Sequence, residues 1–447
     1  MNAGTEEPRV PQAQTPLVRS GTMTLASRGV IFGLAIVSNV ILARTLAPQG
    51  RGLYALALVA PSAVALVANL GISQALVYFL AKRIYTRDQL IGQVVSLSFI
   101  LGGAATLGLL AIAAAAGGAI LPGVPLSLVL IAGASIPLAL FFYYSLSFEQ
   151  GLENFVGFNA IYVVNAVALV VLLAPLVVAK GNVTLAVTAW SLSWVPTAAA
   201  GLYLLSRSGR LNVRLDLTVL RALLRFGIVG YLSFMTNYLN LRLSTFLVNI
   251  FTNATQVGFY AVAVTLAETI WYISTAASTV LAPRVAGAEG AAPEITTGRV
   301  SRVVLWTSAA ASLALAITAP IVVRVLFGSA FRPSVIAIWL LLPGIVTLSV
   351  ARVLSSYLLG KNRLRVDLAA AVAGLVVTLV LDVVLIPRYG FAGAAIASSV
   401  AYTTTMTVNF IWVVRHSDLS VRDLLVPTMS DVRDVTRLVR FRLRRAT

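Results

Sequence analysis

Long apolar runs recur along the chain, and short polar segments separate them. A helix needs roughly 20 apolar residues to cross a bilayer, because each residue rises about 1.5 Å and the hydrocarbon core is about 30 Å thick. Many runs hold Gly, Ser and Thr among Ala, Val and Leu, which favours closely packed helices over barrel strands. The pattern predicts an all-α polytopic membrane protein with about twelve transmembrane helices, at residues 22–43, 52–80, 91–115, 126–148, 158–178, 183–204, 226–249, 257–281, 300–323, 334–358, 367–386 and 392–413.

The composition agrees with a membrane protein, since 59% of the 447 residues are hydrophobic and only 11% are charged. Residues 1–21 are polar and contain three prolines, so we expect a disordered cytoplasmic tail rather than a cleaved signal peptide. The chain has no cysteine. This excludes disulfides, thiol catalysis and cysteine-ligated metals.

The 33 basic residues divide unequally between the two ends of the predicted helices. With the N-terminus inside, 25 fall in inner segments, and the 6 in outer segments are Arg44, Arg51, Lys180, Arg324, Arg332 and Arg388. Lys and Arg in short loops stay on the cytoplasmic side. We therefore expect both termini in the cytoplasm, at a bacterial plasma (inner) membrane. Topology then explains most of the net charge of +18, and no nucleic-acid partner is expected.

Residues 414–447 are predicted to form a basic cytoplasmic tail. Within it, residues 431–445 place valines along one helical face among arginines. Such a segment either lies on anionic membrane lipid or is a solvated end that enforces topology.

One stretch of sequence occurs twice: ARTLAPQGRGLYALAL, residues 43–58, returns as NIFTNATQVGFYAVAV, residues 249–264. At an offset of 206 the identical pairs are Gly52 and Gly258, Tyr54 and Tyr260, Ala55 and Ala261, Ala57 and Ala263, and Pro137 and Pro343. The repeat divides the twelve predicted helices into two halves of six. Because six is even, both halves enter the membrane from the same side, and we expect the working cavity between them. We predict an N-terminal lobe at 22–206, a cytoplasmic linker at 207–225 and a C-terminal lobe at 226–413.

Several segments in a fixed order resemble a known family: VILARTLAPQGRGLYALAL from Val40, LGISQALVY from Leu70, VGFYAVAV from Val257, LAPRVA from Leu281 and LIPRYGFAGAAIA from Leu385. Over residues 22–413 the chain resembles the polysaccharide flippases of the multidrug, oligosaccharidyl-lipid and polysaccharide exporter superfamily. The resemblance implies export of a polyprenyl-diphosphate-linked oligosaccharide from the inner to the outer leaflet, by alternating access between two lobes, for surface polysaccharide synthesis. Asp382 departs from the pattern, since such sequences often carry Asn there.

A lipid-linked sugar needs a polar path, because each unpaired hydroxyl moved into hydrocarbon costs roughly 4 to 8 kcal/mol. Arginine is the donor best shaped to hold a diphosphate, and charges within membrane helices are costly. The candidate ligands for diphosphate and sugar are therefore Arg242, Arg352, Arg28, Asn69, Asn237 and Asn240, with Asn165 and Asn409 as further polar side chains. Arg28 and Arg352 could instead snorkel to the headgroups, and the asparagines could instead join helices by hydrogen bonds.

Glu268 and Asp382 are the acidic residues well inside predicted helices. Either could carry a coupling proton or sodium ion. Asp382 could instead meet Arg388. Glu268 could instead pair with Arg242, because the depths of these two residues in the membrane differ by only about 6 Å. The chain has no Walker-type phosphate loop, so we expect any energy for transport to come from a proton or sodium gradient. We also expect no bound cofactor, no metal site and no catalytic residue.

Three alternative functions remain open. A cation-coupled multidrug exporter of the same superfamily is favoured by the acidic pair and disfavoured by the arginines. A membrane-embedded glycan polymerase or ligase would usually need a sizeable outer loop, whereas the outer connections here are about ten residues or fewer. A peptidoglycan-precursor flippase typically carries two further helices. The expected partners are the lipid-linked oligosaccharide, membrane lipids, a polysaccharide polymerase and glycosyltransferases.

Overall fold

The computed structural model describes residues 17–287 and 292–427, and every regular element in these ranges is a helix. The N-terminal half contains α1 (Leu17–Asn69), α2 (Ile72–Ala81), α3 (Arg87–Ile120), α4 (Leu126–Gly133), α5 (Ile136–Gly151), α6 (Phe155–Leu173), which continues as a 3₁₀ turn (Ala174–Val177), and α7 (Val183–Ser208).

The C-terminal half repeats this series of long helices. It contains α8 (Leu217–Phe251), α9 (Ala254–Glu268), α10 (Trp271–Gly287), α11 (Ala292–Val322), which continues as a π-helical turn (Val323–Phe327), a 3₁₀ turn (Ser329–Phe331), α12 (Ser334–Gly360), α13 (Leu364–Tyr389), α14 (Phe391–His416) and the short α15 (Val421–Leu425).

α1 holds the first two predicted spans, which join at a kink. Ala47 has non-helical backbone angles (φ 57°, ψ 177°) and precedes Pro48, which lacks a backbone N–H and disfavours helical geometry in the residue before it. The chain doubles back here, because Arg51 reaches Asn39, 12 positions earlier, whereas 12 residues of straight helix would span about 18 Å.

Three further spans are interrupted but continuous in direction: α2 extends the second half of α1, α4 leads into α5, and α9 leads into α10. Counted as spans, the described helices form the twelve predicted segments. By length and composition alone, eight helices of the described residues qualify as membrane-crossing, while α8 and α14 are as long but are not among them. The predicted fold class is confirmed.

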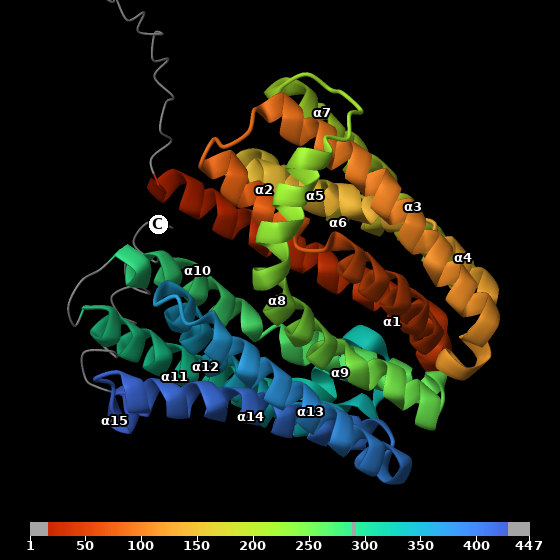
Figure 1. The fold of residues 1–447 in the computed structure, drawn as a ribbon. Helices are drawn as coiled ribbons and strands as arrows, with labels where there is room; N and C mark the ends of the chain where they lie inside the picture. Colours follow the sequence, from red (N-terminus) through yellow and green to blue (C-terminus); the bar gives the residue numbers. More distant parts are fainter. Residues whose placement is uncertain (1–16, 288–291, 428–447) are drawn as a thin grey trace, which may run out of the picture.

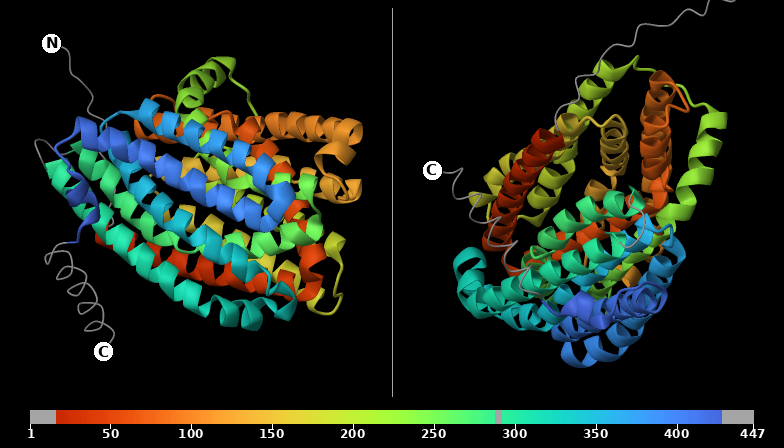
Figure 2. Two further views of the ribbon diagram at one scale, coloured as in Figure 1. Left: turned by 90° about the horizontal axis from the view of Figure 1, so that it is seen from below. Right: turned by 90° about the vertical axis from the view of Figure 1, so that its left-hand side faces the viewer.

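The two halves form two lobes, with red to yellow helices on one side and green to blue helices on the other (Figures 1 and 2). α8 starts beside the N-terminal lobe and runs into the C-terminal lobe. It begins at Leu217, inside the segment expected to be a linker, and Asp216 caps it by accepting from the N–H groups of Thr218 and Val219. The connection is attached to α3, because Gln93 Nε2 donates to Asp216 O at 3.0 Å.

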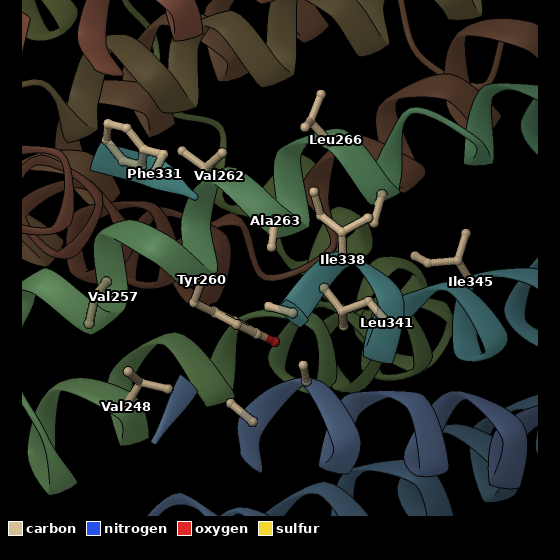
Figure 3. Close-up of a cluster of buried hydrophobic side chains, with 14 of the residues drawn as sticks. Val248, Val257, Tyr260, Val262, Ala263, Leu266, Phe331, Ile338, Leu341 and Ile345 are labelled. Atoms are coloured by element: carbon tan, nitrogen blue, oxygen red, sulfur yellow. The ribbon is translucent and has the colours of Figure 1, made fainter. Parts of the chain in front are cut away.

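We call the end of the bundle near Ser27 and His416 the terminal end, and the opposite end, near Ala47 and Gly390, the kink end. One hydrophobic core spans both lobes, since it contains Leu56 and Ala60 of α1 together with Tyr260 and Val262 of α9. Figure 3 shows part of this core in the C-terminal lobe, around Tyr260. Towards the terminal end the lobes have separate cores, one built from α2, α3, α5 and the start of α8 and the other from α10, α12 and α14. The lobes are therefore joined chiefly at the kink end.

The repeated stretch lies on both sides of this junction, where it contacts its own copy. A Cβ atom on Gly52 would lie 1.7 Å from the carbonyl oxygen of Ala254, and one on Gly258 would lie 2.0 Å from that of Pro48. Only glycine permits such an approach of two backbones. We call this contact of Pro48, Gly52, Ala254 and Gly258 the seam.

Polar contacts close the kink end further. Arg44 Nε donates to Leu326 O at 2.9 Å, and Asn249 Nδ2 donates to Pro122 O at 3.0 Å. Both hydrogen bonds run between the lobes. The structure is therefore closed at the kink end.

Candidate functional site

A cavity of about 390 Å³ lies between the lobes, next to the shared core. One wall is a face of α1, and the facing wall comes from α9, α10 and α12. The lining residues are Arg28, Phe32, Ala35, Ile36, Asn39, Thr265, Glu268, Thr269, Trp271, Tyr272, Thr275 and Arg352. Charged groups, aromatic rings and hydroxyls from both lobes thus meet in one space.

Arg352 projects from α12 into this cavity. Its Nη1 donates to Thr275 Oγ1 at 3.0 Å, and its guanidinium carbon lies 4.3 Å from the centroid of the Trp271 ring. A cation over the face of a tryptophan is attracted by the ring quadrupole. These contacts hold the guanidinium in the cavity wall, so snorkelling does not describe Arg352.

Arg28 lies on the facing wall, in α1. One turn further along α1, Phe32 meets Tyr272 of α10 edge to face, with ring centroids 5.2 Å apart. This aromatic pair joins the lobes within the cavity. Arg28 and Arg352, which the sequence proposed separately as diphosphate ligands, therefore share one site.

Arg242 and Glu268 form the ion pair that the sequence left as one of two alternatives. Arg242 Nη1 and Nη2 lie 3.3 and 3.4 Å from Glu268 Oε1 and Oε2. The side chains remain 35% and 22% exposed, respectively, and Glu268 itself lines the cavity. The pair is therefore accessible from the cavity. It can hold α8 and α9 together and also contact a substrate.

Asn39 and Arg51 belong to this region, although neither was a candidate ligand from the sequence. Asn39 follows Arg28, Phe32, Ala35 and Ile36 on one helical face, so its spacing was a usable signal. From the sequence, Arg51 was counted with the basic residues of the outer segments. It lies in the helical turn after the kink and is only 6% exposed, because the doubling back of α1 carries it inward.

The other asparagines are used within the protein rather than in the cavity lining. Asn69 Nδ2 donates to Ser73 Oγ at 2.8 Å across the break between α1 and α2, and buried Asn240 accepts from Thr378. Asn165 Nδ2 donates to Thr197 Oγ1 at 3.1 Å between α6 and α7. Asn237 is half-buried in α8 and is not one of the lining residues. The bonds of Asn69, Asn165 and Asn240 agree with the alternative role of joining helices by hydrogen bonds.

Asp382 is fully buried inside the C-terminal lobe, away from the cavity. Its Oδ2 accepts from Ser244 Oγ at 2.8 Å, and Ser244 Oγ lies 3.4 Å from Ser398 Oγ, which is 2.9 Å from the Tyr260 hydroxyl. Within the described residues Asp382 Oδ1 has no hydrogen-bond partner. The side chain therefore belongs to a polar network of four helices and does not meet Arg388.

No group of three or more His, Asp or Glu side chains in the described ranges is arranged to hold a metal ion. The cavity instead concentrates cations. Arg28, Arg352 and the Arg242–Glu268 pair together carry two positive charges in excess. An anion is the natural ligand of such a site.

The chain forms two lobes of six spans each around an inter-lobe cavity, and this architecture recurs in transporters of the multidrug, oligosaccharidyl-lipid and polysaccharide exporter (MOP) superfamily. The fold is similar to that of the lipid II flippase MurJ in an inward closed conformation, with a TM-score of 0.77 and 12% identity over 90% of this chain and 89% of that one. It is also similar to an inward-facing multidrug resistance MATE family transporter, with a TM-score of 0.68 and 17% identity over 88% and 97%.

A third similar structure is a MOP superfamily transporter from Pyrococcus furiosus, with a TM-score of 0.63 and 16% identity over 88% of this chain and 94% of that one. The chain belongs to the polysaccharide biosynthesis protein family, whose model matches residues 41–336. Comparison with curated proteins gives no match. The family predicted from the sequence is confirmed.

Proposed function

We propose that the protein is a flippase that moves a polyprenyl-diphosphate-linked oligosaccharide from the inner to the outer leaflet for surface polysaccharide synthesis. The observation that carries this proposal is the excess of two positive charges in the inter-lobe cavity. A diphosphate linking a lipid to a sugar carries one negative charge on each phosphate. Arginine binds phosphate oxygens through two parallel N–H groups, so charge and geometry both suit this substrate.

Alternating access supplies the movement in this proposal. The conformation described here is closed at the seam, and the cavity borders the shared core and extends towards the terminal end as far as Arg28. Rocking of the lobes about the shared core would close the terminal end and open the kink end. The distribution of Lys and Arg favours the terminal end as the cytoplasmic side. This supports transport in the outward direction across the inner membrane by a protein whose termini are both cytoplasmic.

Ion coupling is a further part of the proposal. Asp382 is buried with one carboxylate oxygen free of hydrogen bonds within the described structure, and a buried carboxylate must bind a proton or a cation or bear a large desolvation cost. A proton or a sodium ion bound there would alter packing among α8, α9, α13 and α14. Glu268 is less suited to this role, because Arg242 already neutralises it.

The reactions before and after transport follow from the substrate. Glycosyltransferases must assemble the lipid-linked oligosaccharide on the side where loading occurs, and a polymerase or ligase must consume it on the other side. Membrane lipids surround the apolar faces of the lobes. We propose these enzymes as functional partners of the protein.

The test is transport by purified protein in vesicles. A fluorescent polyprenyl-diphosphate oligosaccharide is followed with a membrane-impermeant quencher, which reports the fraction of lipid in the outer leaflet. Wild-type protein should equilibrate the lipid between leaflets, and Arg352→Met should slow this at least about tenfold by removing one charged ligand. Failure of the wild type to move the lipid would overturn the proposal.

A drug exporter remains the second candidate, because Trp271, Tyr272 and the Glu268 carboxylate share the cavity and could hold an aromatic cation. The excess positive charge opposes such a ligand. Vesicles assayed with a cationic dye in place of the lipid distinguish the two functions: dye transport without lipid transport would establish the exporter.

A further inference from the structure

Arg51 is a buried cation that the proposed loading site does not use. Its Nη2 donates to Asn39 Oδ1 at 2.8 Å, and its guanidinium carbon lies 5.5 Å from the centroid of the Tyr54 ring. Its Nε is buried without a hydrogen-bond partner, and no carboxylate of the described ranges pairs with it. An arginine held in this way within a membrane segment is costly, and its presence calls for a function.

Packing at the seam does not require this arginine. The offset that aligns Gly52 with Gly258 places Val257 opposite Arg51 in the C-terminal repeat. Val257 is fully buried and packs in the shared core. The fold therefore accepts an aliphatic side chain at the equivalent position, and only one of the two copies carries the charge.

The position of Arg51 connects it with both the cavity and the seam. Its partner Asn39 lines the cavity, about 16 Å along α1 from Arg28, so the guanidinium lies directly behind the wall at that depth. The next residue, Gly52, approaches Ala254 of the other lobe. Separation of the lobes at the kink end would therefore release the helical turn that carries Arg51 from its contact with the other lobe.

We propose that Arg51 and Asn39 form a second anion site, which takes the diphosphate of the transported lipid in the state that is open at the kink end. The inference rests on the proposed function and deepens it. Arg28 and Arg352 receive the diphosphate at loading, and Arg51 receives it after the lobes have rocked. Asn39 turns from Arg51 towards the cavity in this step and exposes the Nε and Nη groups to phosphate oxygens.

The experiment separates loading from transport. We compare affinity and transport among five purified proteins, with the fluorescent polyprenyl-diphosphate oligosaccharide as the probe. They are the wild type, Arg51→Met, Arg51→Lys, Arg28→Met and Arg332→Met. Arg28→Met should weaken binding about tenfold or more, because a charged ligand is lost at the loading site. Arg51→Met should bind the lipid with unchanged affinity but transport it at least about tenfold more slowly. The transport rate of Arg51→Lys should lie between those of Arg51→Met and the wild type, because lysine keeps the charge but loses the bidentate geometry.

Arg332 is the matched control, because it is an exposed arginine at the kink end, and Arg332→Met should behave as wild type. Thermal unfolding separates function from folding: Arg51→Met should melt at the same temperature as wild type or higher, since replacing a buried charge by an apolar group is often stabilising. A lower melting temperature would assign Arg51 to structure, and wild-type transport by Arg51→Met would overturn the site.

Two further outcomes are separable. Absence of transport by wild type would overturn the proposed function itself, whereas a working wild type with an equally active Arg51→Met overturns only the second site. Vesicles of neutral phosphatidylcholine are compared with vesicles containing phosphatidylglycerol. An effect of Arg51→Met that appears only with the anionic lipid would show that a lipid headgroup, rather than the substrate's diphosphate, is the ligand.

Discussion

Replacing Arg242 and Glu268 one at a time should change diphosphate binding in opposite directions. The two side chains neutralise each other in the structure, with nitrogen to oxygen distances of 3.3 and 3.4 Å. Arg242→Ala leaves one excess positive charge at the cavity, and Glu268→Ala leaves three. If the charge of the cavity selects the ligand, the first change weakens binding and the second strengthens it.

The size of this effect follows from electrostatics. Two unit charges about 6 Å apart interact by about 0.7 kcal/mol in bulk water and about 2.8 kcal/mol at an effective dielectric constant of about 20. The side chains are 35% and 22% exposed, so the site lies between these limits. We expect a change of about 1 to 2 kcal/mol in each direction, which is about five- to thirtyfold in the dissociation constant.

The same pair also contributes to stability, but modestly. Removal of one partner from a fully buried pair costs about 3 to 5 kcal/mol, and exposed pairs contribute about 0 to 1 kcal/mol. Partial exposure of both side chains and the long contact distances place this pair in between, at about 1 to 2 kcal/mol. Arg242→Ala should therefore fold and reach the membrane while failing to export.

The assay is titration of purified variants with a fluorescent polyprenyl-diphosphate oligosaccharide at two ionic strengths, with Arg332→Ala as the control for loss of an exposed arginine. The double variant Arg242→Ala with Glu268→Ala restores the excess of two charges and should bind within about threefold of wild type. Weaker binding by Glu268→Ala, or loss of Arg242→Ala to degradation followed by restored export in the double variant, would show that the pair only holds α8 and α9 together.

Further tests address topology, the seam and coupling. A reporter active only in the cytoplasm should work when fused after Arg87 and be silent after Lys180; the reverse would invert the proposed orientation. Gly52→Ala places a Cβ within 1.7 Å of the Ala254 oxygen, so it should lower the melting temperature and increase labelling of single cysteines at the kink end, and unchanged labelling would contradict a closed seam. Asp382→Asn keeps a hydrogen-bonding group for Ser244 but removes the charge, so transport should lose its dependence on pH or sodium. A retained dependence would exclude Asp382 as the coupling site.

The spans and the lobes could be predicted from the sequence because hydropathy and repeated glycines record them directly. The break between the first two spans was predicted at residues 44–51, and the kink at Ala47 lies within this segment. The sequence could not predict how the turn after the kink packs against Asn39, which buries Arg51. Counting charges between apolar runs treats every such residue as solvated, although Arg51 already belongs to the second helix.

The candidate site was predicted in part for a similar reason. Arg28, Arg352 and Glu268 stand out by charge alone, and the structure brings them together. Asparagine does not stand out by charge, because the same residue type forms hydrogen bonds at a helix break, as Asn69 does, and lines the cavity, as Asn39 does. Only the position of Asn39 on the same helical face as Arg28 marks it in the sequence. Only the fold decides which face of a helix meets the other lobe.

The contacts of the seam have the symmetry of a homodimer interface within one chain. Gly52 meets Ala254 and Gly258 meets Pro48, and both pairs are related by the same offset of 206, so each patch is complementary to its own copy. In a dimer of identical subunits every charge near such an interface occurs twice, so both copies of one position would carry arginine. Joining the halves in one polypeptide removes this restriction, so the same position is arginine in one repeat and valine in the other.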